Sequence, residues 1–328
     1  MKKITLIALL ISLISCKSTK EELKTIDGNA IGTTFSIRYL DSSSVKFEGK
    51  IDSLISLVNK SVSTYISSSD ISKVNKGDST IVIDEFFKEV FLKSERIYKD
   101  TNGDFDPTVG VLVNAWGFGP GDAIKDLDSA KVKELLKFVG FNKVKLVNNR
   151  IQKKYPEIYF DFNSIAKGFL VDVVSRLFEN HSIKNYMVEI GGEIRARGVN
   201  QNGEYWRIAI ENPNFDGSRS FATTIQLKNE SMATSGNYRK YRTTEDGMKY
   251  VHTINTKTGF ATESNLLSAS VISKSDCSDV DAYATAFMAM GLEKTKIFLN
   301  KHSELKAYLI YADGNGELIM YKTPNFES

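Results

Sequence analysis

The sequence has 328 residues, of which 41% are hydrophobic and 11% aromatic, so the chain can bury a sizeable globular core. Its 43 basic and 40 acidic residues give a formal net charge of +3, which argues against a nucleic-acid-binding protein and against a strongly acidic partner. The two cysteines are Cys16 and Cys277, and no internal disulfide can form if the first of them is modified.

The N-terminal segment has the pattern of an export signal. Lys2 and Lys3 precede an apolar run over residues 4–14, which is too short to span a bilayer. The ending Leu-Ile-Ser-Cys at Cys16 resembles the lipobox of bacterial lipoproteins, in which the cysteine is acylated; a plain signal peptide followed by a chance cysteine is the alternative. We therefore predict a lipoprotein signal peptide over 1–15, a lipidated Cys16 with a polar tether over 16–28, and one domain over 29–328.

Hydrophobic periodicity predicts helices mainly in the first half of the chain and strands mainly in the second. A strand is expected over 33–40, and helices over 51–58, 87–98, 132–139 and 165–178, the third of them closed by Gly140. Further strands are expected over 185–190, 205–210, 221–227, 266–272, 305–311 and 317–322, with a hairpin turn between the last two. This pattern favours an α+β fold, with helices packed on largely antiparallel mixed sheets, over a regular βαβ alternation.

Two glycine-containing stretches are candidate ligand-binding loops. Asp104 and Asp106 precede a glycine-rich run over 117–121, which is not a dinucleotide-binding fingerprint because a proline interrupts it and no capped helix follows directly. By spacing alone this stretch is a loop. The glycine pair at 191–192 would allow the backbone to approach a ligand closely, and a β-bulge explains it equally well.

A strand that ends at Asp161 leads into a helix near Asn163 and Ser164, with Lys167 in its first turn. Backbone N–H groups at a helix start, together with a lysine, suit a phosphate. An ordinary N-cap by Asn163 or Ser164 explains the same residues equally well.

The acidic stretch that begins at Asp276 does not match an EF-hand, because no glycine stands at its sixth position and Phe287 stands at its twelfth. Asp281 and Thr285 remain a candidate pair, because residues four apart lie on one face of a helix. A carboxylate and a hydroxyl suit a magnesium ion that also holds phosphates, whereas a solvated surface pair is the alternative.

His252 lies in "YVHTINTKTG", a strand that runs into a turn at Thr258 and Gly259. A histidine at such a strand end can be the base of a reaction or a packing residue. His181 and His302, each near a helix end among polar neighbours, are expected to be structural.

The order of several segments resembles the ApbE family of FAD:protein FMN transferases. The segments are "AIGTTFSIRY", "STYISSSDISKVN", "GDFDPTVGVLVNAWGFGP", "DFNSIAKGFLVD", "VEIGGEIRARG", "TSGNYRKYR", "YVHTINTKTG" and "DAYATAFMAMG". The resemblance extends from about Asn29 to the C-terminus. It implies an α+β fold, FAD as substrate, Mg²⁺ as cofactor, and transfer of FMN to a threonine or serine hydroxyl of another protein with release of AMP.

The resemblance also implies roles for individual residues. His252 matches the residue that abstracts the proton, and Ser164, Asp281 and Thr285 match the metal ligands. The FAD contacts would be Ile31, Tyr65, Asp104, Phe105, Asp106, Asp161, Lys167 and Ile254. Two departures stand out: Ile31 replaces a methionine, and Asn255-Thr256 replaces an Asp-Pro, which puts the orientation of the base in doubt.

The same residues would also serve an Mg²⁺-dependent FAD pyrophosphatase, in which water replaces the acceptor hydroxyl. A third possibility is a non-catalytic FAD-binding lipoprotein, against which the intact His252, Asp281 and Thr285 argue. The acceptors in the family are flavoprotein subunits of respiratory complexes of the Nqr and Rnf types. We therefore expect an exported protein that is anchored to a membrane by its lipid and faces the periplasm.

Overall fold

The computed structural model describes residues 21–214, 218–237, 241–243, 249–251, 253–261 and 264–327. The predicted signal peptide, Cys16 and His252 lie outside these residues, so the predictions about them stay predictions. Within the described ranges, no helix is both long enough and apolar enough to cross a membrane.

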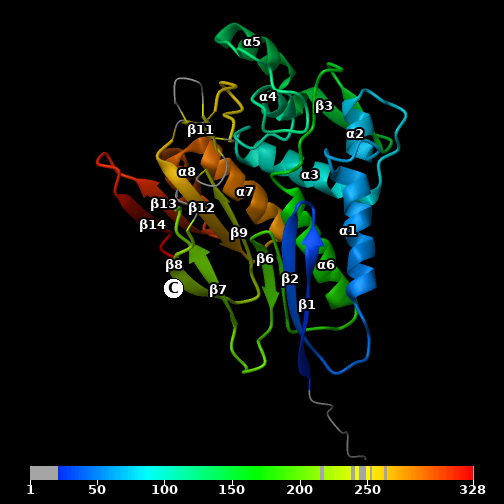
Figure 1. The fold of residues 1–328 in the computed structure, drawn as a ribbon, viewed down its shortest axis with the longest axis vertical. Helices are drawn as coiled ribbons and strands as arrows, with labels where there is room; N and C mark the ends of the chain where they lie inside the picture. Colours follow the sequence, from blue (N-terminus) through cyan, green and yellow to red (C-terminus); the bar gives the residue numbers. More distant parts are fainter. Residues whose placement is uncertain are drawn as a thin grey trace, which may run out of the picture.

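The centre of the fold is an antiparallel sheet that draws strands from both halves of the chain (Figure 1). Each neighbouring pair of strands in it is antiparallel, as the predicted α+β class requires. Within the described residues it has eight strands, in the spatial order β1 (Glu22–Ala30), β2 (Thr33–Asp41), β5 (Tyr186–Ile190), β6 (Glu193–Arg197), β9 (Ser231–Gly236), β12 (Leu266–Ser273), β13 (Lys306–Ala312) and β14 (Leu318–Lys322).

Helices pack against one face of this sheet and form the larger part of the core (Figure 1). They are α1 (Glu48–Val62), α2 (Asp70–Asn75), α3 (Glu85–Asp100), α6 (Ala166–Asn180), α7 (Cys277–Met290) and α8 (Leu292–Leu299). α1 is amphipathic, because Ile51, Ile55 and Val58 recur at helical spacing and are buried. α7 is different: between Cys277 and Ala289 every residue except Thr285 is buried.

The other face of the sheet is covered by a hairpin of β7 (Trp206–Glu211) and β8 (Phe221–Leu227). Trp206 and Ile208 of the hairpin share a second core with Ile194 of β6 and Ile310 of β13. Since the central sheet is covered on both faces, β12 is buried at every position except Leu267, although it contains three serines.

The remaining elements form a smaller region at one end of the sheet (Figure 1). They are α4 (Gly110–Ala115), α5 (Ser129–Leu135), β3 (Val144–Val147), β4 (Arg150–Lys153), β10 (Tyr241–Thr243) and β11 (Lys249–Val251). The predicted helix over 132–139 is α5 followed by a 3₁₀ turn, and it is not closed by Gly140. Instead Gly140 begins a second 3₁₀ turn, and its N–H donates to the Thr108 hydroxyl at 2.7 Å.

The predicted tether over 16–28 is wrong for residues 22–28, because these residues belong to β1. This strand pairs with β2 along its whole length and buries Ile26 and Ala30. It is an edge strand with one solvated face, so its polar residues are outward-facing strand positions. Outward-facing polar residues look like a linker when only composition is considered.

Candidate active site

The site is built around the start of α6, where the first four N–H groups need partners from outside the helix. Ile165 stands at the N-cap position, and no side chain among the described residues caps it there. The N–H of Gly168 instead donates to Oδ2 of Asp281 on α7, at 3.0 Å and 113 residues away. The interpretation of Asn163 or Ser164 as an ordinary N-cap is therefore wrong.

α6 and α7 cap each other. Asp172 of α6 accepts hydrogen bonds from the N–H groups of Cys277 (2.7 Å) and Ser278 (2.9 Å), which begin α7. The helices can approach this closely because a Cβ on Gly168 would lie only 2.5 Å from the Cys277 carbonyl oxygen. This antiparallel pair fixes the position of Asp281 relative to the first turn of α6.

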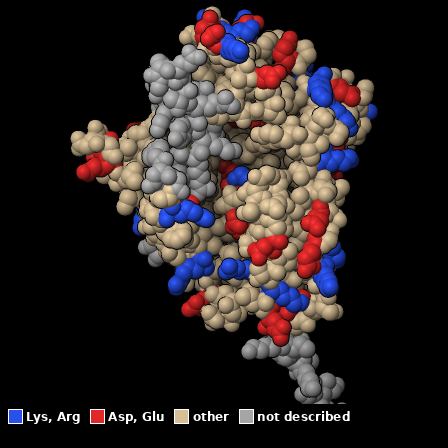
Figure 2. All heavy atoms as spheres, in the orientation of Figure 1, with Lys and Arg blue, Asp and Glu red and all other residues tan. Residues whose placement is uncertain are grey.

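Three charged residues meet at this point. The Nζ of Lys167 forms an ion pair with Oε2 of Glu193, the first residue of β6. Glu193 is 1% exposed and Asp281 is 3% exposed, whereas the Lys167 side chain is 32% exposed and reaches the surface of the cluster. Figure 2 shows that this face of the molecule is hollowed near its centre, with acidic and basic atoms visible inside the hollow.

The pKa values in the cluster reflect two buried carboxylates that share one ammonium group. Burial raises the pKa of Glu193 to about 8, with Lys167 opposing the rise and Asp281 adding to it. Burial also raises the pKa of Asp281, against the effects of Lys167 and of the Gly168 N–H. Burial disfavours the charged form of Lys167, but the two carboxylates outweigh it and raise the pKa of the ammonium group. Glu193 is therefore largely protonated below about pH 8, and its carboxylate adds a full negative charge to the cluster only above that pH.

Thr285 is the one partly exposed residue between Cys277 and Ala289 of α7 and lies one turn after Asp281. Its hydroxyl oxygen is 3.3 Å from that of Ser235 on β9. The described part of the chain contains no group of three or more His, Cys, Asp or Glu residues that could hold a metal. A cation here would thus depend on Asp281 together with uncharged oxygens from Thr285 and the half-buried Ser164, a donor set that fits Mg²⁺.

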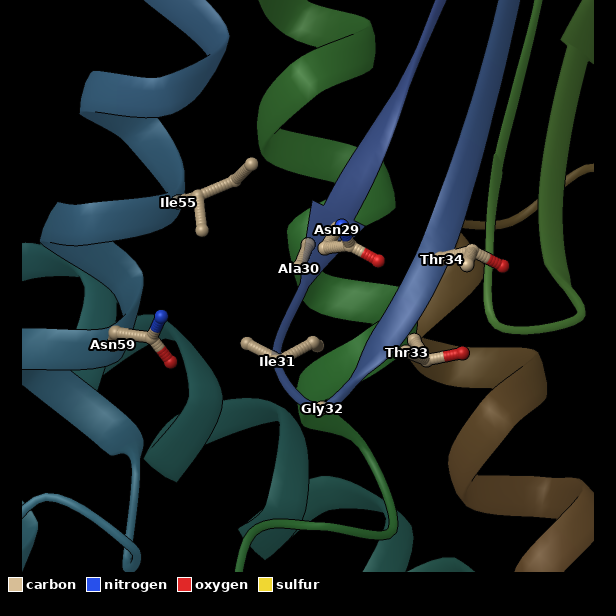
Figure 3. Close-up of a pocket in the computed structure, with 8 residues that line it drawn as sticks. All are labelled: Asn29, Ala30, Ile31, Gly32, Thr33, Thr34, Ile55 and Asn59. Carbon is tan, nitrogen blue, oxygen red and sulfur yellow. The ribbon is translucent and has the colours of Figure 1, made fainter.

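The turn between β1 and β2 borders this cluster. Ile31 (φ +43°) and Gly32 form the turn, and with Asn59 of α1 they line a pocket of about 550 Å³ (Figure 3). In Figure 3 the side chains of Ile55 and Asn59 project from α1 toward the turn. A Cβ on Gly191 would lie 2.7 Å from Thr33 Cγ2 and 3.3 Å from Lys167 Cδ, so the turn and the lysine are neighbours.

Asp161 and Tyr65 lie on the other side of the α6 start. Asp161 is buried, its N–H donates to the Pro107 carbonyl at 2.7 Å, and its Oδ1 accepts from the Asn163 N–H at 2.9 Å. The Tyr65 ring is 63% exposed, and its hydroxyl interacts with the Asn163 side chain. An aromatic ring held at the surface in this way is available to stack on a ligand.

The loop that contains Asp104, Phe105 and Asp106 divides into one site residue and two structural residues. Asp104 is half-buried and forms a 2.8 Å ion pair with Lys257. The Phe105 side chain is 2% exposed within the main core, so its predicted contact with FAD would be made through its backbone.

Asp106 is also structural. Its carboxylate accepts hydrogen bonds from the N–H (2.9 Å) and hydroxyl (2.6 Å) of Thr108 and from the N–H of Phe141 (3.1 Å). Burial raises the pKa of Asp106 to about 6, with these donors opposing the rise. Both of its oxygens hold the loop together, and its predicted contact with FAD stays a prediction.

Ile254 follows His252 by two residues and is 5% exposed, packed with Leu112, Val132 and Val139. It forms an isolated antiparallel bridge with Ala261, so the predicted strand does run into a turn here. The indole N–H of Trp116 donates to the Gly259 carbonyl at 2.9 Å and holds this turn against the loop after α4.

The other two histidines make local contacts away from the cluster. Nδ1 of His181 is 2.8 Å from the Leu177 carbonyl oxygen at the far end of α6. The His302 ring stacks on Phe298, with the ring centroids 3.9 Å apart. Both contacts agree with the structural roles expected for these residues.

Glu193 was not among the predicted site residues. Gly191 (φ +62°) and Gly192 (φ +101°), which precede it, form a two-residue hairpin turn between β5 and β6 rather than a bulge. The available signal was a Gly-Gly dipeptide between two alternating stretches, which is typical of a type I′ hairpin. Recognising that hairpin would have placed Glu193 at the start of an inward-facing strand.

Comparison with known proteins agrees with this architecture. The sequence profile of the ApbE family matches residues 31–309. An FAD:protein FMN transferase from Haemophilus influenzae is 36% identical, over 94% of this chain and 92% of its own, and one from Escherichia coli K12 is 29% identical, over 99% and 96%. The solved structure of the flavin transferase ApbE from Vibrio cholerae is 33% identical, covers 93% of this chain and 98% of its own, and superposes with a TM-score of 0.83. The chain belongs to the ApbE family.

Proposed function

We propose that this chain is an FAD:protein FMN transferase, which moves FMN from FAD to a threonine or serine hydroxyl of an acceptor protein and releases AMP. Its family and the names of its relatives support this activity. The observation that carries the proposal is the meeting of Lys167 and Asp281 at the first turn of α6, with Thr285 one turn after Asp281 on α7. A cation, a helix N-terminus and hard oxygen ligands are what a metal-bound pyrophosphate needs.

FAD would bind with its phosphates at the start of α6 and one of its ring systems in the pocket beside Ile31. Lys167 would contribute positive charge to the phosphates, since its ammonium group is the exposed member of the charged cluster. Tyr65 and Asp161 flank the same helix start and would define the other side of the binding site.

Asp281, Thr285 and an oxygen of Ser164 would hold a magnesium ion. When bound, this ion neutralises phosphate charge and stabilises the leaving group. Asp281 suits the role because the Gly168 N–H holds one of its oxygens in a fixed orientation. The chain thus supplies a carboxylate whose orientation is already fixed, on a helix that is buried on nearly all sides.

His252 would take the proton from the acceptor hydroxyl as it attacks the phosphorus atom of the FMN half. A positioned general base contributes about 10²–10⁴ in rate. The residues that follow it belong to the turn that ion-pairs with Asp104 through Lys257. This ion pair holds the residues that follow the proposed base next to Asp104, which is a proposed FAD contact.

We also propose that the protein is exported and anchored to a membrane through an acylated Cys16, facing the periplasm. The acceptors would be flavoprotein subunits of membrane-bound respiratory complexes of the Nqr and Rnf types. Two or more acyl chains give stable anchoring. Anchoring would therefore keep the enzyme on the same surface as its acceptors.

The test is incubation with FAD, Mg²⁺ and a candidate acceptor, followed by detection of covalently bound flavin fluorescence on a denaturing gel. We expect labelling that a chelator abolishes and that Mg²⁺ restores. His252→Ala should reduce the transfer rate by about 10²–10⁴ and leave FAD affinity nearly unchanged, because the proton belongs to the acceptor. The wild-type rate should rise with pH as the imidazole loses its proton, because the neutral form is the one that can act as a base.

His181→Ala is the matched control, because this histidine lies at the opposite end of α6 and should leave transfer unchanged. Near wild-type transfer by a folded His252→Ala variant would exclude the assigned base. Release of free FMN and AMP at full rate without acceptor, with no labelled protein, would instead identify an FAD pyrophosphatase.

A further inference from the structure

Glu193 is a buried carboxylate next to the site, and its contact with Lys167 has a consequence for the order in which ligands bind. It is 1% exposed and pairs with the ammonium group that the proposed function assigns to the substrate phosphates. Asp281 acts on the same ammonium group from α7. With both carboxylates ionised, the three groups carry two negative charges and one positive charge. Above about pH 8, where Glu193 is ionised, the site therefore has one surplus negative charge at the place where a pyrophosphate must bind.

The backbone holds Glu193 in place. It directly follows the tight Gly191-Gly192 turn and is the first residue of β6, paired with Ile190 of β5. Lys167 has a flexible side chain and is partly exposed, so the lysine adapts to the glutamate rather than the reverse. The stem of Lys167 also passes close to Gly191, where a Cβ would lie 3.3 Å from Lys167 Cδ.

A surplus negative charge has opposite effects on the two ligands. It attracts a divalent cation and repels the phosphates of FAD, because Coulomb interactions remain strong where water is largely excluded. Asp281 is an inferred metal ligand, whereas Glu193 touches the lysine. The charge of Glu193 can therefore be removed without removing a metal ligand.

We propose that Glu193 is a positioning residue that acts through Lys167: it holds and partly neutralises the ammonium group, so that the site binds the cation first and holds FAD weakly until the cation is present. This inference rests on the proposed function. In this role Glu193 determines the order in which the two ligands bind, and it binds neither of them itself.

Glu193→Gln tests the proposal, because it keeps the size of the side chain and removes its charge. FAD affinity would be measured by quenching of flavin fluorescence, first with a chelator and then during a titration with MgCl₂. The measurement is made at ~pH 9, so that the wild-type carboxyl, with a pKa of about 8, is ionised. We expect Glu193→Gln to bind FAD ~10-fold more tightly than wild type in chelator. The Mg²⁺ concentration that gives half of the maximal change in FAD affinity should rise ~10-fold.

The decisive result is that the affinities for FAD and Mg²⁺ shift in opposite directions, because damage to the fold would weaken the binding of both ligands. Glu230→Gln is the matched control: Glu230 is 4% exposed and pairs with Lys306 at 2.7 Å, as the last residue before β9. It should change thermal stability without shifting either affinity. Glu193→Asp, which keeps the charge, should stay close to wild type in chelator.

Unchanged or weaker FAD binding by folded Glu193→Gln in chelator would overturn the inference. If this variant does not fold, Glu193→Met provides the same test, because an apolar side chain of similar size often replaces a buried charge without loss of stability. Failure of the wild-type protein to bind FAD at all would count against the proposed function. Normal wild-type binding with no change in the variants would count against the role of Glu193 alone.

Discussion

Thr256 illustrates how single residues adapt the site in this chain. Where the family pattern has Asp-Pro, Asn255 accepts hydrogen bonds through Oδ1 from the N–H groups of Lys257 (2.9 Å) and Thr258 (3.0 Å). An asparagine oxygen serves in such a turn much as a carboxylate does. The Thr256 hydroxyl donates to the Gly103 carbonyl at 2.5 Å, a bond that proline cannot make. The departure from the pattern thus adds an attachment to the loop of Asp104.

We predict that Thr256→Val will reduce the rate of FMN transfer about 3–10-fold, because a hydrogen bond of this kind contributes roughly 0.5–1.5 kcal/mol to the geometry it maintains. Thr256→Ser keeps the hydroxyl and should restore most of the rate. Transfer rate, FAD affinity and melting temperature would be measured on the same preparations. Equal rates for the valine and serine variants would show that the bond has no role in positioning.

At the scale of secondary structure, Asp281 has two functions that substitutions can separate. Its Oδ2 caps α6 through the Gly168 N–H, and the carboxylate is the one charged member of the inferred metal-ligand set. Asparagine keeps an oxygen for the cap and loses the charge, whereas alanine loses both.

We therefore predict that Asp281→Asn and Asp281→Ala will both need far more Mg²⁺ for the same FAD turnover. The alanine variant should in addition be less stable than the asparagine variant by about 1 kcal/mol, the usual value of a helix cap. Thermal unfolding and an Mg²⁺ titration would check this. Full turnover of either variant at wild-type Mg²⁺ concentrations would remove Asp281 from the ligand set.

The elements that were predicted correctly are those with a local signal. β8 matches its predicted range, and β2, β12 and α6 match within two residues, because alternation or helical spacing is complete within each stretch. β1 was missed because an edge strand exposes polar residues on its outer face.

The site residues divide in the same way. Asp281 and Thr285 share a helix face, as their spacing of four predicted. The partner of the α6 start is 113 residues away and has no signal in the local sequence, whereas the partner of Lys167 is signalled only by the Gly-Gly hairpin that precedes it. Phe105 and Asp106 match the family motif, but a motif match does not reveal burial.

For the whole molecule, the start of β1 limits how far the folded domain can lie from the proposed anchor. The sheet begins at Glu22, so the segment from Cys16 to that point spans at most about 20 Å when fully extended. The turn at Ile31 lies at the opposite end of β1 (Figure 1), about 30 Å further along the strand. An anchored enzyme would therefore present its site to acceptors close to the membrane surface.

We predict that Cys16→Ser will abolish incorporation of labelled palmitate and greatly slow labelling of a membrane-embedded acceptor. The same variant should modify a soluble acceptor fragment at the wild-type rate, because the described domain begins after the tether and its site is unaltered. Palmitate on the variant would contradict lipidation of Cys16. Slow labelling of both acceptors would indicate damage to the enzyme itself.

The reciprocal caps of α6 and α7 bear on how the protein forms during synthesis. A chain that has emerged only as far as β9 contains Lys167 and Glu193 but lacks the carboxylate that completes the first turn of α6. It also lacks α7, whose first N–H groups donate hydrogen bonds to the buried carboxylate of Asp172. The hydrogen bonds that cap the two helices can therefore form only after α7 has been synthesised. A nascent or prematurely terminated chain would bind no FAD, and flavin binding would report that synthesis has passed the end of α7.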